Sequence, residues 1–351
     1  MHQAPALTVD RIRTAMWAAL REEDLWPHWD AYEAGRGRVV GWGETEIGEL
    51  QRVVGRRVWR AALDGAARPV SDADVVRIVG MGRLLSEHLL APLALPSDTR
   101  TPLARLGALA NLIVALYDNF LDGRGSGTPL SRSALSADSG KRGLMLFWHR
   151  SLGTVDERLM GRLVELYYRR LQLLTPPSLA GSARLAFIHR TIRRMYDAED
   201  ATRTRSGPPS RAALRRKAAL PFVVMGLPGW LVASPGTTTL FWHVGWLYRV
   251  GLFFGAIDDA VDMEADRAAS HPNTLTSELS LANDPEQALQ RFVRRVARAG
   301  TGLASAWLKR VPEHEKTDPI VSRAIQITTC SWLGGSGWQP WAESAGTSDG
   351  P

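Results

Sequence analysis

The chain has 351 residues, 45% of them hydrophobic and 23% charged, with a formal net charge of +7. This composition is typical of a soluble globular protein, and the length allows a sizeable core. The single cysteine, Cys330, excludes an internal disulfide framework, and with no signal peptide at the N-terminus it predicts a cytoplasmic protein. The run nearest to a membrane span, residues 218–233, contains Pro221 and Pro228, so no spanning helix is expected.

Apolar periodicity predicts helices along most of the chain, and alternating strand patterns are nearly absent. In chain order the predicted helices cover residues 105–121, 144–152, 158–174, 183–202, 238–266 and 285–311. Clusters of Gly, Pro and Ser predict loops at residues 122–129, 175–177, 206–209 and 234–236. No convincing linker divides the chain. We therefore predict one all-α domain over residues 1–341, followed by a disordered tail at 342–351.

The first acidic pair lies at the end of a very apolar helix. Asp118 and Asp122 are four residues apart in the stretch ALYDNFLDG, at the C-terminal end of the predicted helix 105–121. Carboxylates at that end oppose the helix dipole, so simple capping does not explain them. They are better explained as acids directed into the mouth of a cavity.

A second acidic group follows the apolar run that ends at Ile257. Read as a helix, Asp258, Asp262 and Asp266 lie on nearly one face, Asp259 lies beside it, and Glu264 points elsewhere. Such a row of oxygen ligands suits Mg²⁺, whereas a solvated acidic helix end is the simpler alternative. Because two matched groups end two apolar helices, the metal interpretation is favoured.

A basic group lies between the two acidic ones. Residues 201–257 contain no Asp or Glu, and Arg211, Arg215, Arg216 and Lys217 directly precede an apolar stretch. A nucleic-acid groove would spread such charge more widely and mix in aromatic residues. Metal-holding acids, guanidinium groups and an apolar wall together suit a diphosphate on an apolar tail. Each arginine taken alone could equally be a solvated surface residue.

These segments resemble the class I isoprenoid synthase superfamily, which includes terpene cyclases, trans-prenyltransferases and squalene or phytoene synthases. Asp118–Asp122 is similar to the first aspartate-rich motif in its DxxxD form, and Asp258–Asp262 reads as DDxxD. Residues 263–275 are similar to the stretch after the second motif in several bacterial members. Arg216–Phe222 looks like the segment that places a diphosphate-binding lysine in prenyltransferases. The resemblance covers about residues 100–280.

The chain also departs from these families. The first motif is not a DDxxD, the second lacks the Asn-Ser-Glu triad of bacterial cyclases, and no Arg-Tyr pair follows near the C-terminus. These departures leave the subfamily open. Among these subfamilies, the motifs of this chain most resemble those of the large-terpene synthases of the tetraprenyl-curcumene type.

The resemblance implies the isoprenoid synthase fold, an all-α bundle around a central apolar cavity. It implies Mg²⁺ as the cofactor, with a catalytic set of Asp118, Asp122, Asp258 and Asp262, and a metal-binding set that adds Asp259 and Asp266. The implied diphosphate-binding residues are Arg211, Arg215, Arg216, Lys217 and Arg267. The candidate cavity lining is Phe120, Trp242, Trp246, Phe253 and Phe254, each of which could equally be an ordinary core residue.

The function expected from these residues is that of a terpene synthase, a carbon–oxygen lyase. It would ionise a polyprenyl diphosphate, cyclise the allylic carbocation and release diphosphate. The alternatives are a soluble prenyltransferase, acting by chain elongation or head-to-head condensation, and a catalytically degenerate helical partner subunit. An integral prenyltransferase is disfavoured, because it would need many membrane-spanning helices and none is expected in this sequence. The cyclase is favoured because Arg83, Arg100 and Arg105, upstream of the first motif, look scattered. A prenyl diphosphate is the expected ligand and nucleic acid is not, while a homodimer and peripheral contact with a membrane remain open.

Overall fold

A computed structural model describes residues 8–66, 69–122, 154–203, 210–233, 237–269 and 271–334. Every regular element in these ranges is helical, which confirms the predicted all-α fold. In chain order the elements are α1 (Val9–Glu22), α2 (Trp29–Val54), α3 (Arg56–Asp64), α4 (Asp72–Leu90), η1 (Ala91–Leu93), α5 (Ser97–Asp122), α8 (Val155–Leu173), α9 (Leu179–Arg203), α10 (Arg211–Gly226), α11 (Gly229–Val232), α12 (Thr237–Val261), α13 (Met263–Ala269), α14 (Thr274–Ser280), α15 (Pro285–Leu308), α16 (Glu313–Lys316), α17 (Pro319–Ser322) and α18 (Ala324–Leu333).

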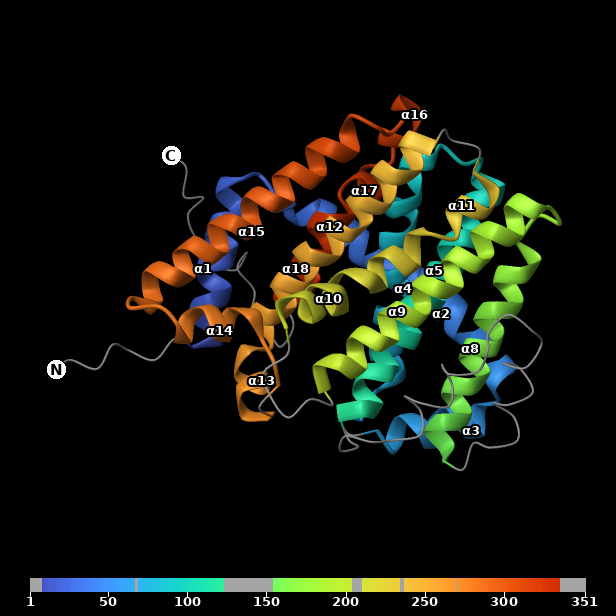
Figure 1. The fold of residues 1–351 in the computed structure, drawn as a ribbon, viewed down its shortest axis with the longest axis horizontal. Helices are drawn as coiled ribbons and strands as arrows, with labels where there is room; N and C mark the ends of the chain where they lie inside the picture. Colours follow the sequence, from blue (N-terminus) through green and yellow to red (C-terminus); the bar gives the residue numbers. More distant parts are fainter. Residues whose placement is uncertain are drawn as a thin grey trace, which may run out of the picture.

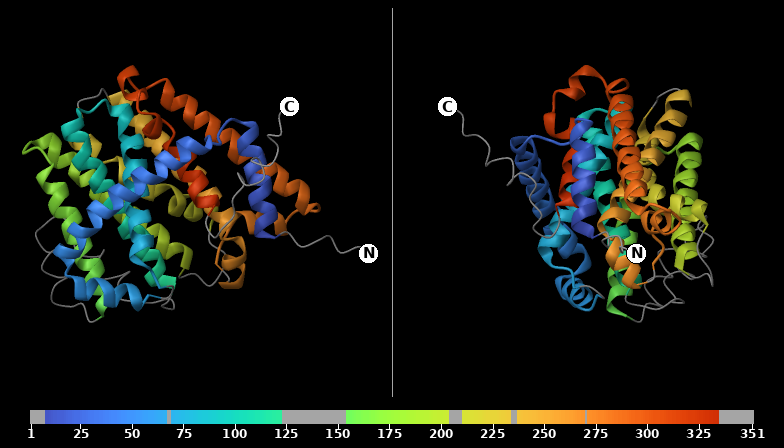
Figure 2. Two further views of the ribbon diagram at one scale, coloured as in Figure 1. Left: turned by 180° about the vertical axis from the view of Figure 1, so that it is seen from behind. Right: turned by 90° about the vertical axis from the view of Figure 1, so that its left-hand side faces the viewer.

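The longer helices form a bundle with α4 and α5 in its middle. Figure 1 looks onto α9, α10 and α12, and the view from behind in Figure 2 looks onto α2. α2 packs on α4, α4 packs on α5, and α10 contacts α5, α9 and α12, while α15 connects α1 with α12. One large cluster of buried apolar side chains runs through these layers. Burial of this cluster is the main favourable contribution to folding.

The predicted helices are mostly confirmed where the structure describes them. Residues 105–121, 158–174, 183–202 and 285–311 correspond to α5, α8, α9 and α15, and the loop at 175–177 separates α8 from α9. The predicted helix 144–152, the loops at 206–209 and 234–236 and the tail 342–351 lie outside the described residues.

Four helices that the periodicity does not predict, α1 to α4, precede α5. In α2 the helical pattern is hidden by glycines, which weaken a helix unless packing requires them. Packing does require Gly43, because a Cβ there would lie 2.1 Å from the carbonyl oxygen of Val76 in α4. The close approach of α2 to α4 therefore explains a sequence that looks like a poor helix.

The predicted helix 238–266 is wrong at its C-terminal end. α12 stops at Val261, the chain bends at Asp262, and α13 begins at Met263. Backbone bonds of helical spacing continue across the bend, from Asp262 N to the Asp258 carbonyl and from Asp266 N to the Asp262 carbonyl, both 2.8 Å long. The bend thus changes the direction of the helix without ending the four-residue spacing.

α12 is the most apolar long helix among the described residues. Its segment Thr239–Val261 has a mean hydropathy of 1.2 and is long enough to cross a membrane by length and composition alone. In the fold it packs against α10, α15 and α18. A helix buried in a core meets the same criteria of length and composition.

α12 and α10 approach each other closely through small residues. A Cβ at Gly251 would lie 2.5 Å from the Cα of Ala219, and one at Gly255 would lie 2.4 Å from the Cβ of Ala218. Only glycine fits at such distances from a neighbouring backbone. This contact places Lys217, the residue before Ala218, next to the acidic end of α12.

Candidate active site

Acidic residues from three helices meet around one lysine. Lys217 Nζ on α10 lies 3.0 Å from Glu199 Oε1 on α9 and 3.6 Å from Asp118 Oδ1 on α5. In Figure 1 the C-terminal ends of α5, α9 and α12 and the first turns of α10 all lie in the lower half of the bundle. The two acidic groups, 140 residues apart in sequence, are therefore brought together with the basic segment between them.

The start of α10 decides which basic side chain reaches the acids. Ser210 caps the helix by accepting a hydrogen bond from Ala213 N, 3.2 Å away. Arg211, Arg215 and Arg216 are then exposed, and Arg216 Nε donates to the carbonyl of Ala212 in its own helix. Lys217 is the member of the group that faces the carboxylates.

Asp258 lies near several other carboxylates. Desolvation by surrounding protein atoms raises its pKa well above the ordinary value, and the carboxylates of Asp262, Asp259 and Asp118 raise it further, against the opposing effect of Lys217. Part of the side chain is nevertheless open to solvent. By surface area Asp258 is an exposed residue, so a ligand can reach its carboxyl group.

Asp259 and Asp266 have other partners. Thr274 N donates to Asp259 Oδ2 at 3.2 Å, and the amide of Asn273 donates to Asp266 Oδ2 at 2.9 Å. Desolvation raises the pKa of Asp259 to about 6, although the hydrogen bonds from Thr274 lower it. The structure thus connects these two aspartates to the start of α14. Their prediction as metal ligands stays untested.

The oxygen chemistry of the site fits a hard divalent cation. Mg²⁺ prefers carboxylate oxygens and completes its shell with water and substrate phosphates. Within the described ranges, no three Asp, Glu, His or Cys side chains enclose one ion by themselves. The backbone of α5 reaches Asp122, while the side chain of Asp122 lies outside the described residues.

Glu199 is a site residue that the motifs did not reveal. It belongs to the short acidic run DAED at residues 197–200, near the C-terminal end of α9. The rule that singled out Asp118, acids of the wrong charge at a helix C-terminus, applies equally to this run. The rings of Tyr117 and Tyr196, which precede Asp118 and Glu199, meet edge to face at 4.9 Å, so α5 and α9 are in direct contact at this point.

The predicted aromatic lining is packed in the core. Phe254 is fully buried and stacks on Phe222 at 5.1 Å, and Trp246 is fully buried and stacks on Trp242 at 5.8 Å. Phe120 and Phe253 are also buried. A cavity-lining role for these five residues stays a prediction, as does diphosphate binding by Arg267, which is exposed on α13.

The upstream arginines are not scattered, contrary to expectation. Arg83 Nη1 lies 3.6 Å from Glu46 Oε1, and Arg105 donates to Glu46 and to Glu49. Arg100 Nε lies 3.1 Å from Glu87 Oε2. Sequence distance hid this convergence because the glutamates come from α2 and α4.

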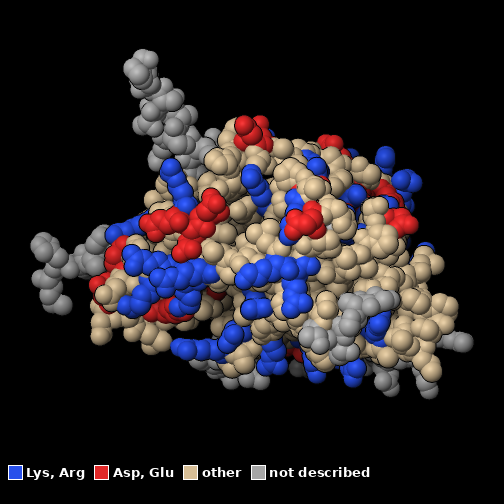
Figure 3. Space-filling model, turned by 90° about the horizontal axis from the view of Figure 1, so that it is seen from above, with Lys and Arg blue, Asp and Glu red and all other residues tan. Residues whose placement is uncertain are grey.

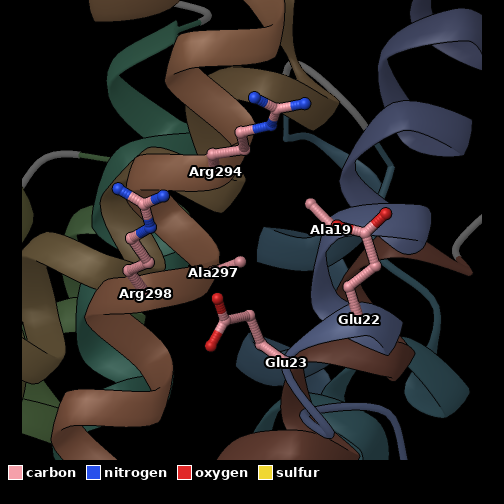
Figure 4. Close-up of a pocket in the computed structure, with 6 residues that line it drawn as sticks. All are labelled: Ala19, Glu22, Glu23, Arg294, Ala297 and Arg298. Carbon is pink, nitrogen blue, oxygen red and sulfur yellow. The ribbon is translucent and has the colours of Figure 1, made fainter.

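A separate pocket of about 240 Å³ lies between α1 and α15. Figure 4 shows Arg294 and Arg298 on the α15 side, Glu22 and Glu23 on the α1 side, and Ala19 and Ala297 between them. Figure 3 shows basic side chains in a band across the top of the molecule as drawn in Figure 1. Because the pocket's charges are of both signs, it offers no particular attraction for a diphosphate.

The sequence matches no protein-family model and no curated protein. Among solved structures it is similar to a polyprenyl synthase from Caulobacter crescentus CB15, complexed with calcium and isoprenyl diphosphate, at 16% identity and a TM-score of 0.47. That similarity covers 85% of this chain and 97% of the other. A polyprenyl synthetase from Streptomyces coelicolor A3(2) is similar at 14% identity and a TM-score of 0.40, over 80% of this chain and 98% of the other.

Proposed function

We propose that this protein is a divalent-metal-dependent enzyme that ionises a prenyl diphosphate. The observation that carries the proposal is the meeting of Asp118, Glu199 and Lys217 from three helices, next to the acidic end of α12. A group of carboxylates around one ammonium has excess negative charge, which divalent cations would balance, and the bound cations would in turn attract a polyanionic ligand. Mg²⁺ is the proposed metal, and Asp118, Asp258 and Asp262 are the residues proposed to hold it.

Asp118, Asp258 and Asp262 would hold Mg²⁺, and the bound ion would supply stabilisation of the negative charge on the leaving diphosphate. Lys217 would donate a charge-assisted hydrogen bond to the same group, because its ammonium already lies between the acidic helix ends. Glu199 would keep that ammonium in place. The buried apolar side chains of α5, α10 and α12 would exclude water from the prenyl chain.

Cyclisation is the first candidate for the step after ionisation. An elongating enzyme needs a second basic pocket for isopentenyl diphosphate. The upstream arginines that could form one, Arg83, Arg100 and Arg105, are already paired with Glu46, Glu49 and Glu87. Lys217 is paired with carboxylates in the same way, so this pairing does not decide between one diphosphate substrate and two, and the assay below has to.

The second candidate is a soluble prenyltransferase. It would use the same acidic residues and Lys217, and it would differ by requiring a second substrate. The two similar structures are named polyprenyl synthase and polyprenyl synthetase, so chain elongation is retained as a candidate reaction.

The decisive experiment incubates purified protein and Mg²⁺ with a panel of prenyl diphosphates, with and without isopentenyl diphosphate. Gas chromatography with mass spectrometry would identify the products. A cyclic hydrocarbon or alcohol formed from one substrate supports the cyclase, and a product longer by five-carbon units only after isopentenyl diphosphate is added supports elongation. A product that needs two allylic diphosphates would indicate head-to-head condensation.

The same assay tests the assignment of the metal site. Asp118→Asn and Asp262→Asn remove a charged oxygen ligand each, so turnover should fall about a hundred-fold or more while the circular dichroism of the helices is unchanged. Asp197→Asn is the matched control, because Asp197 is exposed on α9. Normal turnover in both site variants would contradict the proposal, and a wild-type protein without turnover on any substrate would support the degenerate subunit instead.

A further inference from the structure

We infer that Asn273 is a positioning residue that divides the second acidic group into two functional pairs. It fixes Asp259 and Asp266 as parts of a structural clamp and leaves Asp258 and Asp262 for the metal. The inference rests on the proposed function for its metal-facing half, while the clamp itself can be tested without metal.

Asn273 is buried, with 2% of its surface exposed, and both its amide nitrogen and its amide oxygen are hydrogen-bonded. Nδ2 donates to the carbonyl of Asp259 at 2.7 Å and to Asp266 Oδ2 at 2.9 Å. Oδ1 accepts from Thr276 N at 2.9 Å and so caps α14. One side chain therefore joins the last turn of α12, the helix α13 and the first turn of α14.

A second hydrogen bond strengthens the same junction. Thr274 N, the first backbone donor of α14, reaches Asp259 Oδ2 at 3.2 Å. The last turn of a helix has carbonyls without partners in the helix, and Asn273 satisfies the one at Asp259. The bend at Asp262 is thus held on both sides, by Asp259 before it and by Asp266 after it.

The clamp separates the four aspartates by their partners. Asp259 and Asp266 are seven residues apart, which is two helical turns, and both bond to residues at the start of α14. Asp258 and Asp262, four residues apart, interact with each other, and Asp258 interacts with Asp118 and Lys217 across the site. Asp259 also interacts electrostatically with Asp258 and Lys217, so the division rests on the hydrogen bonds from Asn273 and Thr274. In this arrangement Asp266 has to accept a hydrogen bond, and its negative charge is not required.

That distinction predicts different effects for two substitutions at one position. In Asp266→Asn the side-chain oxygen can still accept from Asn273, whereas Asp266→Ala has no acceptor. The first variant should resemble the wild type, and the second should resemble Asn273→Ala. Asn283→Ala, which removes an exposed asparagine just after α14, is the matched control.

Hydrogen exchange without metal tests the clamp. Asn273→Ala and Asp266→Ala should accelerate amide exchange across residues 259–276 by about ten-fold or more, while Asp266→Asn and Asn283→Ala should not. Equal exchange in Asn273→Ala and the wild type would overturn the clamp. Fast exchange in Asp266→Asn would show that the charge of Asp266 is needed, which contradicts the inference as well.

Calorimetric titration of inorganic pyrophosphate at several Mg²⁺ concentrations tests the division into pairs. Asn273→Ala should raise the Mg²⁺ concentration required for pyrophosphate binding by about ten-fold, as loss of a ligand-orienting partner commonly does. At saturating Mg²⁺ its affinity should return towards that of the wild type. If Asp266→Asn keeps slow exchange and loses pyrophosphate binding, Asp266 is a metal ligand and the division is wrong.

The two arms also separate this inference from the proposed function. A wild-type protein that shows the clamp in exchange and binds no pyrophosphate with Mg²⁺ would count against the proposed function and against the metal-facing pair, and it would leave the clamp supported. A protein that binds pyrophosphate and shows no clamp would refute the inference and keep the proposed function.

Discussion

Lys217 is the basic residue around which the candidate site is organised. Its ammonium lies between Glu199 and Asp118, whereas the neighbouring Arg215 and Arg216 are exposed. A lysine held by two carboxylates loses much of the freedom of its four-carbon chain, so less entropy remains to be lost when a diphosphate binds. The position of this ammonium therefore depends on a residue, Glu199, that need not touch the substrate.

Glu199→Gln tests that dependence. The neutral amide cannot balance the ammonium, so Lys217 should shift towards Asp118 and compete there with the metal. We expect kcat/KM to fall by about ten-fold, mainly through a higher KM for the diphosphate substrate.

Two further variants control for other effects at this position. Asp197→Asn removes a charge from the same helix two residues away and should leave both constants unchanged, since that side chain is exposed. Glu199→Asp keeps the charge on a shorter stem and should recover part of the loss. If Glu199→Gln and Asp197→Asn behave alike, the pair with Lys217 has no role in binding.

Residue types and spacing predicted part of this site. Asp118, Asp258 and Lys217 were identified because acids at the C-terminal ends of apolar helices, and bases in an acid-free window, are unusual. Glu199 carries the same signal, in a shorter run and on a less apolar helix. Periodicity places a residue on one face of its own helix, and it does not say which other helix that face meets.

At the scale of elements, the distance between α10 and α12 controls the site. Gly251 and Gly255 let α12 approach Ala218 and Ala219. As a result the preceding residue of α10, Lys217, reaches the carboxylates. The spacing of two glycines four residues apart is visible in the sequence. Their partner helix is not, because small residues also occur where nothing packs against them.

Gly251→Ala tests the close contact. The new Cβ would meet the Cα of Ala219 at 2.5 Å and its carbonyl oxygen at 2.7 Å, and a helix backbone cannot move aside cheaply. We expect the free energy of unfolding to fall by about 1–3 kcal/mol, as in other overpacked sites. Catalytic efficiency should fall too, because α10 is pushed away from α12.

Gly245→Ala is the control on the same helix. Nothing lies within 4 Å of a Cβ at Gly245, so this change should be neutral or should stabilise by up to about 1 kcal/mol through better helix propensity. Urea unfolding of both variants measures the difference. Equal stability of the two variants would mean that the α10–α12 contact is looser than the structure has it.

The bend at Asp262 shows what element prediction misses. The four-residue spacing of acids and the backbone bonds both continue through it, so no breaker residue marks the end of α12. Hydrogen bonds from Asn273 and Thr274, which lie beyond the helix in sequence, join its last turn to the start of α14. Local patterns cannot reveal an end that is fixed by tertiary hydrogen bonds.

At the scale of the whole molecule, two buried histidines connect helices that are far apart in sequence. His88 of α4 hydrogen-bonds through Nδ1 to the carbonyl of Val321 in α17 at 2.8 Å, and its ring stacks on Trp307 of α15 at 4.5 Å. His243 of α12 hydrogen-bonds through Nε2 to the carbonyl of Leu89 in α4 at 2.8 Å. Since a carbonyl only accepts, each of these ring nitrogens carries the proton.

The second ring nitrogen of His243 is also hydrogen-bonded. Trp230 Nε1 of α11 donates to His243 Nδ1 at 3.1 Å, so this nitrogen is an acceptor and the ring is neutral. Protonation of Nδ1 would replace the accepted hydrogen bond by two donors facing each other. The fold therefore requires neutral imidazole at a point where α4, α11 and α12 meet.

This requirement predicts acid-sensitive stability of the whole bundle. Desolvation lowers the pKa of both His88 and His243 to about 4 from the ordinary 6.5, against the raising effect of their backbone hydrogen bonds. Between these values the unfolded chain binds protons that the folded chain does not, so stability is complete above pH 6.5 and is lost as the pH falls towards 4. At pH 5 each histidine should lower the free energy of unfolding by about 2 kcal/mol relative to its value above pH 6.5.

Urea unfolding at pH 7 and pH 5 measures the effect, and a variant assigns it. His243→Gln should be less stable than the wild type at pH 7, because the ring contacts are lost, and it should lose less stability than the wild type between pH 7 and pH 5. His28→Gln, at an exposed position, should keep the wild-type pH dependence. The raised pKa values of Asp258 and Asp259 act in the opposite direction, so the comparison between variants decides: if His243→Gln loses as much stability as the wild type between pH 7 and pH 5, the buried ring does not resist protonation.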